Sequence, residues 1–190
     1  MKNDQMNFAD ITRVGRQHVV VMGVAGCGKS TVGAALAEHL RAGFIDGDAL
    51  HPQSNIDKMA SGTPLNDDDR APWLAEIGRN FSTSRTALVI ACSALKRRYR
   101  DSIRSGDLSV VFVHLHGSKD VLKQRTEGRA GHFMPPALLD SQLTTLEPLQ
   151  SDEVGIVLDV IHSVDVLVKD AVRHLAAAEK ALAVTLDTGG

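Results

Sequence analysis

The sequence predicts an α/β fold with a five-stranded parallel sheet and helices on both of its faces. Strands are expected at five short apolar runs that are rich in β-branched residues: His18–Met22, Gly43–Asp46, Ala87–Ala91, Val110–Leu115 and Gly155–Val160. These runs are apolar throughout rather than alternating, which is typical of strands covered on both faces. Helical patterns separate them, and strands that alternate with helices imply right-handed crossovers and a parallel, doubly wound sheet.

Apolar stripes at helical spacing mark the main helices between and after the strands. They run over Val32–Leu40, Trp73–Phe81 and Val164–Ala178. We expect Asp69 to cap the second of these helices and Pro72 to lie in its first turn.

A glycine-rich loop follows the first strand directly and leads into the first helix. It matches the phosphate-binding pattern GxxxxGK[ST] in its strand–loop–helix setting, and it reads Gly23-Val24-Ala25-Gly26-Cys27-Gly28-Lys29-Ser30. Backbone N–H groups and the positive end of the helix suit a polyphosphate, Lys29 suits its β- and γ-phosphates, and the Ser30 hydroxyl suits Mg²⁺. A turn that binds nothing is disfavoured because strand, loop and helix are in register. The sequence therefore predicts a P-loop NTPase fold that binds a nucleoside triphosphate.

Composition and charge narrow the classes of function. The chain has 190 residues and a net charge of −2, which predicts a single domain with no general attraction for nucleic acid or an anionic membrane. No apolar run approaches the roughly 18 residues of a membrane span, and Met1–Gln17 lacks the apolar core of a secretory signal. Cys27 and Cys92 form no motif, so we expect reduced thiols and a cytoplasmic location.

Two carboxylates follow the second strand, at Asp46 and Asp48. Ligands of parallel sheets bind beyond the carboxyl ends of the strands, so this turn is expected to face the loop. One carboxylate suits Mg²⁺ and the other suits the proton of an attacking hydroxyl. The alternative is an Asp-Gly turn whose carboxylates cap a helix.

Polar residues for an acceptor molecule come next along the chain. His51, Asn55 and Lys58 fall on one helix face and can read a polyhydroxylated substrate, although a solvated face is the simpler interpretation. Arg70 ends an acidic run, Asp67–Asp69, and its planar fork suits a substrate carboxylate. The alternative for this run is helix capping and a solvated acidic turn.

A basic cluster follows the third strand. Lys96 and Arg100 are four residues apart and are expected to face the site, with Arg97 and Arg98 pointing elsewhere. A nucleic-acid patch with Tyr99 as a stacking residue is the rival interpretation, which the single short cluster and the negative net charge disfavour.

A second pair of cations lies after the fourth strand, at Arg125 and Arg129. Glycines and two prolines follow them, so we expect a hinged flap that brings the arginines onto the phosphates. An ordinary helix end with cations in its last turn is the alternative. The third strand runs into Cys92-Ser93 rather than into an Asp, which argues against switch GTPases and motor ATPases and favours small kinases.

Taken together, these motifs resemble those of gluconokinases of the small phosphate-loop type, over roughly residues 17–178. The resemblance is carried by Met22–Ser30, Asp46–Pro52, Asn55–Gly62, Pro64–Arg70 with Pro72–Leu74, Cys92–Lys96 with Tyr99–Asp101, and Gly131–Phe133. It implies transfer of a phosphoryl group from ATP to the 6-hydroxyl of D-gluconate with Mg²⁺. It also implies a fold like that of nucleoside monophosphate kinases and shikimate kinase, with a mobile lid. Members of the family are often dimers, so the resemblance allows a homodimer.

The resemblance also implies roles for the candidate residues. ATP would be held by Gly23, Val24, Ala25, Gly26, Cys27, Gly28, Lys29, Ser30 and Thr31, and Mg²⁺ by Ser30 and Asp46. Catalysis would involve Lys29, Asp48, Arg125 and Arg129. The sugar acid would be bound by Asp48, His51, Lys58, Arg70, Lys96, Arg100 and His132. Cys27 stands where Ser or Thr is more usual, which predicts a loop sensitive to oxidation.

The expected organisation is one kinase domain over residues 17–182 between tails at 1–16 and 183–190. The substrate-binding helices are expected at about 48–84 and the lid at about 125–137. Adenine contacts carry no motif and are expected near residues 161–164. Three alternatives remain open: a kinase of the same fold that acts on shikimate or a nucleoside monophosphate, a polynucleotide kinase, and a nucleotide-binding regulatory module.

Overall fold

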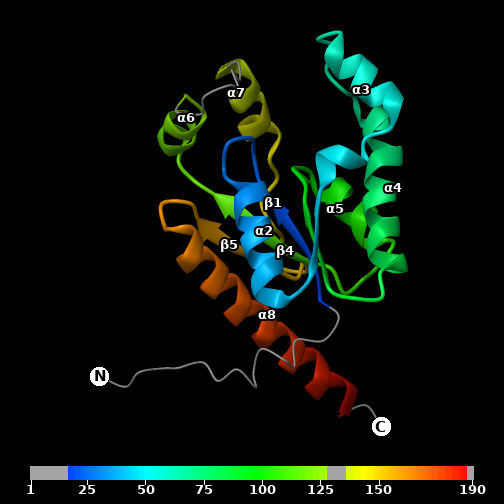
Figure 1. The fold of residues 1–190 in the computed structure, drawn as a ribbon, viewed down its shortest axis with the longest axis vertical. Helices are drawn as coiled ribbons and strands as arrows, with labels where there is room; N and C mark the ends of the chain where they lie inside the picture. Colours follow the sequence, from blue (N-terminus) through cyan, green and yellow to red (C-terminus); the bar gives the residue numbers. More distant parts are fainter. Residues whose placement is uncertain (1–16, 128–135, 188–190) are drawn as a thin grey trace.

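Five parallel strands form one sheet in the order β2-β3-β1-β4-β5, of which β1, β4 and β5 are labelled in Figure 1. The computed structural model of the chain describes residues 17–127 and 136–187. The strands are β1 (His18–Met22), β2 (Gly43–Asp46), β3 (Leu88–Ala91), β4 (Val111–His116) and β5 (Gly155–Asp159). All five predicted strands are therefore confirmed to within one residue at either end, and their parallel pairing is confirmed too.

Helices cover both faces of this sheet, as Figure 1 shows. One face packs against α2 (Lys29–Leu40) and α8 (Val164–Asp187), and the other packs against α4 (Asp67–Thr83) and α5 (Arg97–Arg104). Shorter helices extend the chain beyond the ends of the strands: η1 (Gly47–Leu50), α3 (Gln53–Ala60), α6 (Lys119–Glu127) and α7 (Pro136–Thr145). No helix of the described residues is both long and apolar enough to cross a membrane.

The continuous apolar character of the strands is explained by two separate cores. Side chains of a strand point alternately to its two faces, so Val19 and Val21 enter one core while Val20 and Met22 enter the other. All four are fully buried. Because each core removes apolar surface from water, neither face of the sheet tolerates a polar alternation.

The N-cap of helix α4 lies three residues earlier in the chain than the sequence predicted. Asn66 is the N-cap and accepts a hydrogen bond from the Asp69 N–H, while the Asp69 carboxylate accepts one from the Asn66 N–H. Asp69 is thus the third residue of a reciprocal capping box rather than the cap itself. Pro72 lies within the helix, in its second turn.

The predicted C-terminal tail is also corrected in part, because α8 continues to Asp187. Residues 183–187 contain no glycine or proline, and the first glycine after them is Gly189, so nothing in the sequence ends the helix earlier. The predicted tail at 1–16 and most of the predicted lid, residues 128–135, lie outside the described residues.

Candidate active site

Three glycines give the loop after β1 its tight curl. Gly23, Gly26 and Gly28 have φ angles of 140°, 78° and 97°, which other residues rarely adopt. A Cβ atom on Gly23 would lie 2.6 Å from the carbonyl oxygen of Leu115, so glycine alone fits there. Gly28 is the N-cap of α2, and the first N–H groups of a helix have no partner within it. The loop and helix end therefore form an anion-binding nest.

Two side chains at the start of α2 organise this loop. Lys29 donates a hydrogen bond from Nζ to the Val24 carbonyl oxygen at 3.0 Å, which holds its ammonium group at the loop. Ser30 donates from Oγ to Asp46 Oδ2 at 2.7 Å, across to the end of β2. The predicted contact between the loop and the acidic turn is therefore present.

The Ser30 hydroxyl and the Asp46 carboxylate form a donor pair that fits Mg²⁺. Their separation of 2.7 Å is close to the roughly 2.9 Å between adjacent ligands of an octahedron with bonds of about 2.05 Å. Within residues 17–127 and 136–187, no three or more His, Cys, Asp and Glu side chains gather into a metal site. Magnesium at phosphate sites needs only one or two protein oxygens, since water and phosphate oxygens complete its shell.

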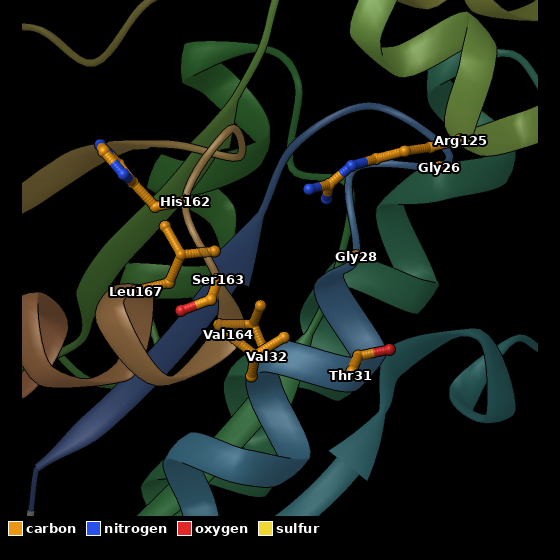
Figure 2. Close-up of a pocket in the computed structure, with 9 residues that line it drawn as sticks. All are labelled: Gly26, Gly28, Thr31, Val32, Arg125, His162, Ser163, Val164 and Leu167. Atoms are coloured by element: carbon orange, nitrogen blue, oxygen red, sulfur yellow. The ribbon is translucent and has the colours of Figure 1, made fainter.

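A pocket of about 350 Å³ opens beside the loop, and Figure 2 shows the residues around it. Arg125 of α6 donates a hydrogen bond to the Val160 carbonyl oxygen, and a Cβ atom on Gly28 would lie 3.9 Å from the guanidinium. Apolar and polar groups from the β5–α8 connection line the other side. The lining residues are Gly26, Gly28, Thr31, Val32, Arg125, His162, Ser163, Val164 and Leu167. Arg125 and the segment near 161–164 thus meet at the loop, where a nucleotide would need them.

The only tryptophan of the chain fixes the acidic turn after β2. Trp73 donates a hydrogen bond from Nε1 to the Gly47 carbonyl oxygen at 2.7 Å. Asp46 N-caps the short helix η1 by accepting from the Asp48 N–H at 3.2 Å, so the capping alternative describes this carboxylate as well. The Asp48 side chain itself is exposed. One carboxylate therefore binds the turn and the Ser30 hydroxyl, and the other is exposed to solvent.

The polar face of α3 packs against the start of α4 rather than lying in solvent. Asn55 is buried, donates to the Asp69 carbonyl oxygen at 2.8 Å and is hydrogen-bonded to His51. Lys58 donates to Asp69 Oδ2 at 2.6 Å, and this bond, with the Asn66 N–H, lowers the pKa of Asp69. The predicted face is confirmed only for Asn55 and Lys58, whose hydrogen bonds join α3 to α4, because His51 precedes α3 and has extended backbone.

His51 lies at the edge of this face and borders the acidic turn. Its ring stacks on Trp73 with centroids 4.1 Å apart. Burial lowers the pKa of His51 below its usual value, with Asp48 acting in the opposite direction. A neutral imidazole beside Asp48 can donate or accept one hydrogen bond from a hydroxyl.

Three cations surround one aromatic ring between α4 and α5. Arg70, Lys96 and Arg98 lie 5.9, 5.4 and 5.6 Å from the centroid of the Tyr99 ring. Asp67 accepts hydrogen bonds from Lys96, at 3.2 Å, and also from Arg98 and from the Tyr99 hydroxyl. We call these five residues the Tyr99 cluster. It contains Arg70 and Lys96 as predicted, and it corrects the expectation that Arg98 points elsewhere.

Arg100 was predicted to bind substrate, and this prediction is wrong. Its side chain is fully buried and forms a bidentate pair with Glu153, at 2.5 and 2.8 Å. Burial is the largest single effect and would raise the pKa of Glu153, but the hydrogen bonds from Arg100 and the Gln150 N–H and the charges of Arg100 and Arg97 together lower this pKa. Four carbonyl groups accept the other Arg100 hydrogen bonds: Ala94, Leu95, Glu147 and Pro148. The guanidinium is therefore a structural cross-link with no donor left for a ligand.

The two cysteines are buried and free of disulfides. Burial, more than the opposing charge of Lys29, raises the pKa of the Cys27 thiol above its usual value. Burial likewise raises the pKa of Cys92 to about 12. Thiols with raised pKa values react slowly, so the structure does not support an oxidation-sensitive loop.

Some predicted residues lie outside the described part of the chain, and some observed contacts had no sequence pattern. Arg129 and His132 belong to the first group. Gln142 and Glu153 belong to the second, because their partners Ala25 and Arg100 are 117 and 53 residues away. Both residues have polar neighbours in the sequence, so no local signal points to them.

Comparison with known proteins agrees with this architecture. Residues 19–149 match a family described as AAA domain. A gluconokinase of Gluconobacter oxydans (strain 621H) is 46% identical over 164 residues, which cover 85% of this chain and 92% of that protein. The thermoresistant gluconokinase of Escherichia coli (strain K12) is 47% identical over 142 residues, covering 73% and 81%.

Solved structures give the same result. The crystal structure of a gluconokinase from Sinorhizobium meliloti 1021 superposes with a TM-score of 0.82 at 47% identity, covering 90% of this chain and 97% of that one. Shikimate kinase from Aquifex aeolicus superposes with a TM-score of 0.52 at 14% identity and shares the fold alone.

Proposed function

Since the chain belongs to the gluconokinase family, we propose that it transfers the γ-phosphoryl group of ATP to the 6-hydroxyl of D-gluconate. The observation that carries this proposal is the Ser30–Asp46 hydrogen bond of 2.7 Å. It joins the phosphate-binding loop to the acidic turn, so a terminal phosphate and an acceptor hydroxyl would meet between them. Positioning and charge stabilisation supply most of the catalysis in such transfers.

The nucleotide would occupy the loop and the adjoining pocket. The nest from Gly23 to Thr31 suits the phosphates, and the pocket walls at Val32, Val164 and Leu167 offer apolar surface to a purine. Lys29 and Arg125 are the cations that would stabilise charge on the moving phosphoryl group. Arg129 remains a predicted partner in this role.

Ser30 and Asp46 would hold Mg²⁺. When bound, the ion offsets the negative charge of the β- and γ-phosphate oxygens. Asp48, which is exposed beside this pair, would accept the proton of the 6-hydroxyl as that oxygen attacks phosphorus.

The Tyr99 cluster would receive the carboxylate of the sugar acid. Arg70, Lys96 and Arg98 concentrate positive charge around one ring, and a carboxylate pairs well with guanidinium and ammonium groups. His51 and Lys58, between this cluster and Asp48 along the chain, would meet the hydroxyl groups. His132 remains a predicted contact.

The test is acceptor-dependent ADP release from ATP and Mg²⁺. D-gluconate would be compared with other aldonates, shikimate and nucleoside monophosphates, and ³¹P NMR would locate the new phosphoester. We expect turnover with D-gluconate and a product phosphorylated at the 6-position. Turnover restricted to shikimate or a nucleotide, or tight ATP binding with no acceptor-dependent turnover, would contradict the proposal.

We further propose a cytoplasmic enzyme that forms a homodimer. The two free thiols suit a reducing compartment. Light scattering on the purified protein measures the oligomeric state directly, and a monomer at all concentrations would refute that part.

A further inference from the structure

A hydrogen bond from a distant helix reaches the crest of the phosphate-binding loop. The Ala25 N–H donates to Oε1 of Gln142, in α7, at 2.6 Å. The neighbouring N–H groups of the loop are held differently, since Gly23 donates to the Ser93 carbonyl oxygen and Cys27 to that of Val24. Of these three N–H groups, that of Ala25 is therefore the one bound by a side chain rather than by a backbone carbonyl.

Helix α7 presents Gln142 from a well-anchored position. Leu139 is buried in the core shared by α2 and α8, and Leu143 packs against the same core. After the helix ends, the Glu147 N–H donates to the Leu95 carbonyl oxygen at 2.8 Å, and its carboxylate accepts from the Arg97 N–H at 2.6 Å. These anchors lie on both sides of Gln142, so the direction of its side chain is set by packing.

We propose that Gln142 is a positioning residue of phosphoryl transfer, which holds the phosphate-binding loop open for ATP through the Ala25 N–H. This inference rests on the proposed use of ATP. An unheld N–H at the crest would turn to water or to another carbonyl, and the remaining N–H groups of the nest would lose their common direction. A neutral amide oxygen fixes the N–H without adding negative charge near the phosphates, which a carboxylate at the same place would do.

Two substitutions separate these effects. Gln142→Met keeps the length of the side chain and removes the acceptor, whereas Gln142→Glu keeps an acceptor and adds a charge. Thr144→Ala is the matched control, because Thr144 is on the same helix and, within the described part of the chain, its hydroxyl donates only to the Asp140 carbonyl oxygen. Calorimetric titration with AMP, ADP and ATP, thermal unfolding, and kcat with both KM values would be measured for each.

For Gln142→Met we expect roughly threefold to tenfold weaker binding of ADP and ATP, in line with the loss of one hydrogen bond. We also expect a lower kcat, an unchanged KM for gluconate and thermal unfolding like that of the control. For Gln142→Glu we expect a loss that grows from AMP to ATP, since repulsion rises with phosphate charge. In Gln142→Met, which adds no charge, a merely structural residue would weaken the binding of AMP, ADP and ATP alike.

The proposal is overturned if Gln142→Met binds ATP like the wild type, or if both variants weaken all ligands equally in proportion to lost stability. Failure of the proposed function is a different result. A wild-type protein that binds ATP without phosphorylating gluconate would refute that function, and the nucleotide titrations of the variants would still decide the role of Gln142.

Discussion

The nucleotide side and the acceptor side of the site are built in opposite ways. On the nucleotide side, the backbone forms most of the site, because three glycines with positive φ and the N-terminus of α2 make up the nest. On the acceptor side, charged side chains are paired with one another across α3, α4 and α5, as in the bonds of Asp67 and Asp69. A rigid nest suits any polyphosphate, whereas cations that are already paired with carboxylates bind only a ligand that can compete with those carboxylates.

The largest effect is expected where the acceptor side is anchored. Arg100→Met removes both hydrogen bonds between the guanidinium and the buried Glu153 carboxylate and leaves only the more distant Arg97, at 3.8 Å, as its cationic partner, which should lower the free energy of unfolding by about 3–5 kcal/mol. Arg97→Met removes a partly exposed arginine from the same helix, whose pairs with the exposed Asp101 and Asp152 should contribute far less to stability. Urea unfolding measures both. Equal losses of unfolding free energy in the two variants would show that the buried Arg100–Glu153 pair contributes no more to stability than the exposed pairs of Arg97.

The next effect tests where the two sides meet. Asp48→Asn should lower kcat by about 10² or more, because the amide cannot accept the hydroxyl proton. Asp68→Asn, an exposed acid in the first turn of α4, is the control and should leave kcat unchanged. Steady-state kinetics with D-gluconate give both values. Near-wild-type turnover of Asp48→Asn would remove this carboxylate from the role of base.

A buried histidine makes the core on the acceptor side sensitive to acid. His114 of β4 is buried, neither ring nitrogen has a hydrogen-bond partner among the described residues, and burial lowers its pKa to about 4. The unfolded chain takes up this proton near pH 6.5 and the folded one only near pH 4. Stability is therefore complete above pH 6.5 and falls as the pH drops between these values.

Replacing the ring by an apolar side chain tests this origin. At pH 5 the His114 contribution amounts to about 2 kcal/mol of lost stability, and His114→Leu should recover it. His116→Gln, at the exposed end of the same strand, should keep most of the pH dependence. Urea unfolding at pH 7 and pH 5 provides the comparison. An unchanged slope in His114→Leu would place the acid sensitivity in other groups.

The contrast between the two sides also explains which parts of the site could be predicted from the sequence. The loop, its helix and the Ser30–Asp46 contact follow from local spacing and from the rule that strand ends share one edge. Helical spacing does not predict the direction of the basic side chains correctly, because Lys96 is the N-cap of α5 and has extended backbone at φ −97° and ψ 148°. Its direction is therefore independent of the helix, and Arg100 turns inward with Tyr99 and Ile103.

Long-range partners were beyond the reach of sequence patterns for a different reason. Glu153 accepts hydrogen bonds from Arg100, and Gln142 accepts one from the Ala25 N–H. In neither case do the two partners belong to the same helix or the same hairpin. Periodicity reports which face of an element is buried but not what it meets. The acceptor side depends on such long-range contacts far more than the nucleotide side does, so its structure is the less predictable of the two.

The smallest effect expected bears on the Tyr99 cluster itself. Lys96→Met should raise the KM for D-gluconate about tenfold, the usual scale for one charge-assisted contact, and leave the KM for ATP unchanged. If the cluster reads the carboxylate, the same variant should treat D-glucitol, which has the hydroxyl groups but no carboxylate, no worse than the wild type does. The partner Asp67 still has Arg98 and the Tyr99 hydroxyl in this variant, so the fold should hold. An equal loss for both acceptors would assign Lys96 to the shape of the site, and the acceptor side would then select its ligand by hydroxyl contacts instead of charge.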